Sequence, residues 1–290
     1  MASSTTVLLG GMLMGKEVYE LTGQLEDMFE SVRWPLDYFL KCHVNENVFY
    51  AQVDEPALHK WEQVKPPQPA YKLDDINPGS AVAAETAAAL AAGSMVFRER
   101  DGGYADKLLQ HARGLYNFAH TYRGLFKDAT EKPNDFTDEL AWGALWLNLA
   151  TEEEQYVEMA KEFMTLEVPK TFSYLDKTVG AQLIYSQVSN DTGYREAVES
   201  FLRQWFPGGT VKYSPRGLAA FRPEGGSVGY AANAAFIAVS AAYFGIVPEE
   251  GVKFAKSQLE YIVGEGDHKG RSLMVGYGED FPQQPRHVGA

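Results

Sequence analysis

Apolar residues recur three and four positions apart over most of the chain, and strict apolar/polar alternation is rare. The first pattern is typical of helices with one buried face, the second of half-buried strands. Helices are predicted near residues 4–20, 25–44, 80–98, 104–123, 137–150, 152–165, 177–188, 193–205, 229–244 and 248–263. Only 48–53, 211–213 and 218–221 resemble strands. Helix pairs with short connections and no βαβ rhythm predict an all-α fold.

The helix beginning near Ser80 is the most unusual, because Ala83 to Ala92 contains alanine at seven of its ten positions. Side chains this small suit a helix that neighbours surround closely on several sides. Ser80 is the expected N-cap, and Glu85 lies where the helix dipole favours a carboxylate. A tightly packed helical core is therefore expected around this segment.

Two long non-periodic segments, 54–77 and 264–290, interrupt the helical pattern. Long loops on a rigid scaffold commonly carry binding residues. The chain shows neither linker composition nor an internal repeat, so we predict a single domain over residues 1–290.

The amino-acid composition restricts the classes of molecule that this protein can bind. A formal charge of −13 argues against nucleic acid and anionic membranes, both of which need basic surface. Cys42 is the sole cysteine, so the fold has no internal disulfide, and its apolar surroundings predict an inert buried thiol. No apolar run is expected to approach a membrane span. The apolar segment 7–14 lacks a preceding Lys or Arg, so we predict that it is part of the first helix rather than a signal peptide. The localisation of the protein therefore stays undetermined.

Short motifs in consistent order then identify a family. They are Asp37-Tyr-Phe-x-Lys41, Pro78-Gly-Ser80 with its alanine helix, Tyr122-Arg-Gly124, Asp138-Glu-Leu-Ala-Trp142, Phe172 to Val179, Ser214-Pro-Arg-Gly-Leu218, Ala231-Ala-Asn-Ala-Ala-Phe236 and Arg271 to Gly278. Together they resemble glycoside hydrolase family 9, the endo-β-1,4-glucanases, and look closest to the animal-type enzymes. The resemblance implies an (α/α)6 barrel with a substrate cleft across the loops at one end. The implied ligand is a β-glucan or an oligosaccharide derived from one.

The resemblance also implies inverting hydrolysis by two carboxyl groups, one activating water and one protonating the leaving oxygen, roughly 6.5–9.5 Å apart. In the family the base precedes the segment that Thr6 to Met14 resembles, and the acid follows the counterpart of Arg286-His287. Neither has a counterpart in this sequence, so an incomplete barrel lacking its first and last elements is expected. Three hypotheses stay open: an endoglucanase in truncated form, a non-catalytic glucan-binding or interaction protein, and a gene fragment. Apolar flanks exposed along an open barrel seam would favour self-association.

Several family cleft residues are replaced. Ala81 stands at an aspartate position and Tyr174 at a tryptophan position. The segment Gly225 to Asn233, which contains Tyr230, lacks the family's Trp, Arg and His. The residues predicted to contact substrate are His59, Trp61, Tyr174, Tyr230 and Arg286.

The candidates for replacement catalytic groups are Asp138, Glu139 and His287. Asp138 and Glu139 stand at a predicted helix start, a position that favours carboxylates even without a catalytic role. The loop carboxylates Glu265, Asp267, Glu279 and Asp280 carry the oxygen ligands that calcium prefers, but their spacing is not that of an EF-hand. We therefore predict no cofactor. Trp142 and Trp146, four residues apart, are expected in the core.

Overall fold

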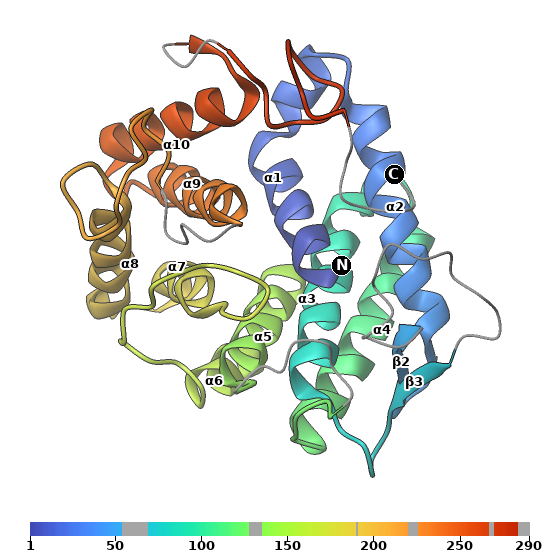
Figure 1. The fold of residues 1–290 in the computed structure, drawn as a ribbon. Coiled ribbons are helices and arrows are strands. Elements are labelled where there is room, and N and C mark those ends of the chain that lie inside the picture. Colours follow the sequence, from blue (N-terminus) through green and yellow to red (C-terminus); the bar gives the residue numbers. More distant parts are fainter. Residues whose placement is uncertain (54–68, 128–134, 190, 220–225, 267–269, 284–290) are drawn as a thin grey trace. The chain divides into compact units, whose positions relative to one another are not determined.

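The computed structural model describes residues 1–53, 69–127, 135–189, 191–219, 226–266 and 270–283 (Figure 1). The chain divides into two compact units, Met1–Met164 and Thr165–Ala290. The described residues form ten helices and one three-stranded sheet, so the all-α prediction is confirmed.

In the first unit the helices are α1 (Ala2–Leu21), α2 (Leu25–Cys42), α3 (Ser80–Phe97), α4 (Gly102–Thr121), α5 (Thr137–Thr151) and α6 (Glu154–Lys161). Helix α3 packs against α1, α4 and α5 (Figure 1). Nearly all of its side chains are buried. The alanine content explains this position, since small side chains let neighbouring helices approach closely. Trp142 and Trp146 on α5 and the thiol of Cys42 are also buried, as predicted.

Helix α3 corrects two expectations. It has the length and hydropathy of a membrane span, with a mean hydropathy of 1.4 over 18 residues, although 83% of that window is buried inside the protein. Buried core helices meet the same criteria, because alanine counts as apolar. Ser80 is the first helical residue rather than the N-cap, which is Gly79. Its hydroxyl instead donates to Ala119 O at 2.9 Å and accepts from Gly124 N at 3.0 Å.

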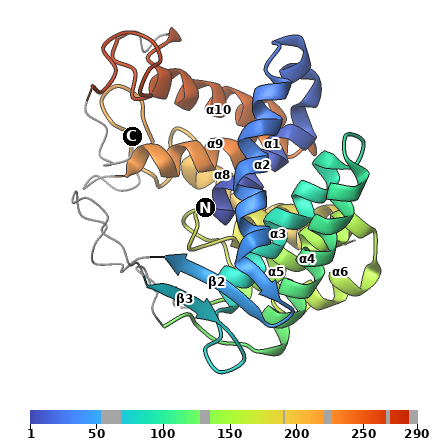
Figure 2. The same ribbon diagram turned by 90° about the vertical axis from the view of Figure 1, so that its right-hand side faces the viewer.

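The sheet consists of β1 (His43–Asn45), β2 (Val48–Val53) and β3 (Ala70–Leu73), all antiparallel in the order β1-β2-β3. Figure 2 shows β2 beside β3. Strand β2 has the predicted bounds. Strand β1 was expected to continue the preceding helix, and β3 was expected to be loop. Both are too short to show a period of their own, and pairing with β2 defines them.

The second unit contains α7 (Thr178–Val188), α8 (Thr192–Trp205), α9 (Ser227–Tyr243) and α10 (Pro248–Val263). Helix α9 packs against α10, α8 and α7. The strands predicted at 211–213 and 218–221 are wrong within the described residues: Tyr213 and Ala219 form one isolated bridge. The Gln258 side chain closes this turn, accepting from Ala219 N at 2.8 Å and donating to Gly217 O at 3.1 Å.

Candidate functional site

The predicted site residues are only partly described. His59, Trp61, Arg286 and His287 lie outside the described residues. Tyr174 and Tyr230 belong to the second unit, whereas Asp138 and Glu139 belong to the first. The predicted substrate contacts and carboxylates that the structure describes therefore lie in different local environments, one in each unit.

Tyr174 lies at the tip of a tight turn between α6 and α7. Ser173 N donates to Asp176 O at 2.9 Å and Asp176 N donates back to Ser173 O at 3.3 Å, which closes the turn around Tyr174 and Leu175. The Ser173 hydroxyl accepts from Leu175 N at 3.2 Å, and Asp176 Oδ1 accepts from Thr178 N at the start of α7. Tyr174 is 52% exposed on this closed turn.

Buried side chains hold the segment that leads to the turn. Gln182 donates through Nε2 to Thr165 O at 2.9 Å and to Glu167 O at 2.8 Å. Trp205 Nε1 donates to Lys170 O at 3.2 Å, and Lys177 Nζ donates to Ser173 O. All three side chains are fully buried. The backbone carbonyls of this exposed segment are thus fixed from inside the unit.

Helix α9 supplies a fourth anchor. Asn233 Nδ2 donates to Phe172 O at 3.0 Å. The Phe172 ring stacks on Phe236 of the same helix, with centroids 6.4 Å apart and planes 15° apart. Tyr230 lies in the first turn of α9, three residues before Asn233, so both are on one face of the helix.

An aromatic ring on an immobilised turn can bind a ligand with little loss of conformational entropy. Tyrosine combines an apolar face with a hydroxyl that donates and accepts hydrogen bonds. Such a group suits a ligand with apolar faces and hydroxyl edges, which describes a sugar ring. The surface formed by Tyr174 and its anchored turn is called the Tyr174 platform below.

Asp138 and Glu139 form the first turn of α5. Glu139 is 2% exposed, whereas Asp138 is half-buried. Consecutive helical residues point in different directions and do not face each other. The pair is therefore poorly arranged to act on opposite sides of one bond. Its position at a helix N-terminus is itself favourable for carboxylates.

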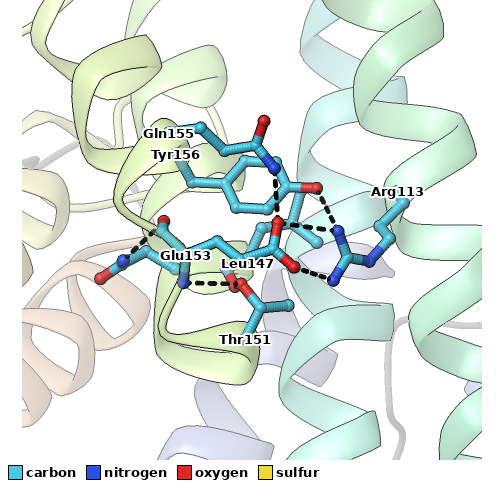
Figure 3. Close-up of polar contacts among 7 residues, drawn as sticks. Arg113, Leu147, Thr151, Glu153, Gln155 and Tyr156 are labelled. Atoms are coloured by element: carbon cyan, nitrogen blue, oxygen red, sulfur yellow. Dashed lines mark hydrogen bonds and ion pairs between the residues drawn. The ribbon is translucent and has the colours of Figure 1, made fainter.

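The first unit also contains a polar cluster that the sequence did not indicate (Figure 3). Arg113 of α4 binds both carboxylate oxygens of Glu153, at the start of α6, and its Nη1 donates to the Tyr156 hydroxyl at 3.0 Å. The Glu153 pKa is lowered, chiefly by the hydrogen bond from Arg113 and then by that from Gln155. The cluster joins α4 to α6, which makes its role structural.

A cavity of about 300 Å³ in the same unit lies among α1, α2 and α3. Its lining includes Met12, Phe29 and Met95, and none of the predicted site residues. Among the described residues, no group of three or more His, Cys, Asp or Glu side chains could hold a metal ion. Within the described part of the chain, the Tyr174 platform is therefore the candidate ligand-binding site.

Of the platform's supports, none was predicted as a functional residue. Gln182 and Trp205 lie in none of the recognised motifs, and Lys177 and Asn233 were noted only as members of family segments. Their role depends on the distant backbone carbonyls they reach.

The chain is similar to known proteins over its whole length. The model of glycosyl hydrolase family 9 matches residues 1–290. Endoglucanase A of Bacillus pumilus is 38% identical over 99% of this chain, a match that covers 47% of that protein. Endoglucanase 24 of Oryza sativa subsp. japonica is 35% identical over 100% of this chain and 63% of its own length. The chain thus spans about half to two thirds of these curated relatives.

Solved structures extend the likeness to three dimensions. The endoglucanase of the termite Nasutitermes takasagoensis superposes with a TM-score of 0.91 at 35% identity, over 100% of this chain and 69% of that one. The cellulase Cel9M in complex with cellobiose gives a TM-score of 0.88 at 29% identity, over 97% of this chain and 68% of that one. The (α/α)6 barrel expected from the sequence is confirmed as the fold class. The chain belongs to glycosyl hydrolase family 9.

Proposed function

We propose that this chain binds a β-1,4-glucan, and that the Tyr174 platform contacts the sugar. The observation that carries the proposal is the exposure of Tyr174 on a turn whose backbone is fixed by buried side chains. The structures of the cellulase Cel9M with cellobiose and of the endoglucanase CelQ with cellotriose support an oligosaccharide of this type as ligand. Tyr230 and the undescribed His59, Trp61 and Arg286 are proposed as further contacts.

We further propose that this chain binds without hydrolysing. Its family acts through two carboxyl groups on opposite sides of the scissile bond. Among the described residues, the candidate carboxylates Asp138 and Glu139 do not face each other and so are not placed for this chemistry. A non-catalytic glucan-binding protein on the family fold is therefore the favoured function, and endoglucanase activity is the second.

Binding and hydrolysis are tested on one purified sample. Calorimetric titration with cellotetraose measures the dissociation constant, reducing-sugar release from a soluble β-1,4-glucan measures hydrolysis, and circular dichroism verifies helical folding. Tyr174→Ala is expected to weaken binding about tenfold or more, as for a central aromatic contact. Tyr243→Ala is the matched control, since Tyr243 is a 66% exposed tyrosine at the far end of α9.

Three outcomes decide between the candidates. Binding without sugar release supports the proposal. Release above that of a heat-killed control supports the endoglucanase, and Asp138→Asn and Glu139→Gln then test the replacement carboxylates. A folded sample that shows neither binding nor release would contradict both and favour an interaction protein.

Self-association is the remaining proposal. The exposed apolar side chains of α1, among them Leu8, Val18 and Leu21, support it. Light scattering coupled to gel filtration should show dimers or larger species at micromolar concentration. A monomer under those conditions would contradict it, and an unfolded sample would favour the gene-fragment hypothesis.

A further inference from the structure

We infer that Asn233 is a positioning residue for glucan binding: it fixes the Tyr174 platform to the face of α9 that carries Tyr230. The inference rests on the proposed function, because it concerns how the same ligand is held. It assigns to Asn233 no contact with the sugar.

The anchors of the platform are not equivalent. Gln182 and Trp205 hold the backbone at residues 165, 167 and 170, and Lys177 bonds within the turn itself. Asn233 holds Phe172, two residues before Tyr174. Of these four anchors, it alone comes from α9. The position of the turn relative to α9 therefore depends on the hydrogen bond from Asn233 to the carbonyl of Phe172.

Phe172 makes a polar and an apolar contact with the same face of α9. Its carbonyl accepts from Asn233, and its 2% exposed ring stacks on Phe236, three residues further along the helix. Residues three apart are neighbours on a helix surface. Ring stacking alone lets two flat surfaces slide, whereas a hydrogen bond to a carbonyl has a preferred distance and direction. Asn233 consequently sets the register of the contact.

Tyr230 completes the relationship. It lies three residues before Asn233 on the same face, about 4.5 Å away along the axis at 1.5 Å rise per residue. A displacement of the turn would thus change the position of Tyr174 relative to Tyr230. Binding groups generally need to be held within about 0.5 Å of their working geometry.

The test compares two asparagines that make the same kind of bond. Asn233→Asp keeps the side-chain shape and removes the amide donor, and Asn233→Ala removes the side chain. Asn148→Asp and Asn148→Ala are the matched controls, because Asn148 Nδ2 also donates to a backbone carbonyl, Glu153 O, at 3.0 Å, in the first unit. Each variant is measured for its melting temperature and for its dissociation constant for cellotetraose.

The Asn233 variants should bind cellotetraose about five- to tenfold more weakly, whereas the Asn148 variants should bind like the parent chain despite a similar fall in melting temperature. Because Asn233 acts through Tyr174, its effect should largely vanish in a Tyr174→Ala background, which a double-mutant cycle measures. Unchanged affinity in folded Asn233→Asp, or a loss fully additive to that of Tyr174→Ala, would overturn the inference and leave the proposed function intact. Failure of the parent chain to bind would overturn the proposed function and the inference with it.

Discussion

Gly143 of α5 lies directly against the backbone of Ala84 on α3. A Cβ atom added to Gly143 would be 2.9 Å from Ala84 O and 3.0 Å from the Tyr116 ring. Separations below 3.0 Å from a backbone atom require a helix to move. The absence of a side chain at Gly143, together with the alanines of α3, is what allows these two helices to pack so closely.

Gly143→Ala should therefore destabilise the protein by about 1–3 kcal/mol through overpacking. Urea unfolding monitored by circular dichroism measures the change. The control is Gly103→Ala on the exposed side of α4, where the added Cβ has no neighbour nearer than 3.9 Å. Its helix propensity should stabilise the protein by up to about 1 kcal/mol. Equal effects of the two substitutions would contradict this account.

Ser80 links the start of α3 to the end of α4. Ser80→Ala removes the buried donor to Ala119 O and leaves the part-buried Gly124 amide without its acceptor. The expected cost is about 1–3 kcal/mol, measured by thermal or urea unfolding. Ser31→Ala removes a hydroxyl bond to Asp27 O on an exposed helix face and should change stability little. A similarly small effect of Ser80→Ala would count against the linking role.

Gln182 holds two carbonyls of the segment that leads to Tyr174. Gln182→Met keeps the side-chain length but removes both bonds, which should cost about 1–3 kcal/mol. Amide hydrogen exchange should also rise over residues 165–176. Gln187→Met is the control on the same helix, since Gln187 is exposed and its amide donates to the neighbouring Ser186 Oγ. Unaltered exchange in Gln182→Met would show that the segment is fixed by other contacts.

His43 of β1 and His111 of α4 predict a dependence of stability on pH. Their Nδ1 atoms are 3.0 Å apart, so one ring must accept from the other. Burial lowers the pKa of both; at His111 the nearby His43 and Lys107 lower it further, whereas at His43 the backbone of Glu46 and Asn45 opposes the effect. Below about pH 6.5 the unfolded chain then binds more protons than the folded chain, so stability must fall as the pH decreases.

The urea midpoint should accordingly be lower at pH 5.5 than at pH 7.5. His111→Gln removes one of the two titrating rings and keeps a hydrogen-bonding side chain, so this variant should show a smaller decrease. An equal decrease in His111→Gln and the parent chain would assign the effect to other groups.

The helices were predictable because each carries its own signal. Helix α10 has the expected bounds, 248–263, and α2 begins at Leu25 as expected. Apolar spacing within one segment is enough to show a helix with a buried face. The short strands β1 and β3 were missed, since pairing with β2 decides them and no local period does.

The residues of the candidate site likewise include some that the sequence predicted and others that it did not. Tyr174 and Tyr230 were predicted as substrate contacts from family motifs in the linear sequence, and they stay predictions. The residues that support the turn were not predicted as functional. Gln182, Trp205 and Asn233 donate to backbone carbonyls 17, 35 and 61 positions away in the chain. A side-chain amide or indole in the sequence gives no sign of which distant carbonyl it will reach.

The sequence by itself therefore determined the helical class, the small-residue core of α3 and the family resemblance, all of which depend on residue spacing over short stretches. Tertiary structure decided that Ser80 links two helices, that the His43 and His111 rings are joined by a hydrogen bond, and that Tyr174 is held on a fixed turn. Each of these depends on groups brought together from distant segments, where burial makes an unpaired polar atom costly and so selects the arrangement in which it is bonded.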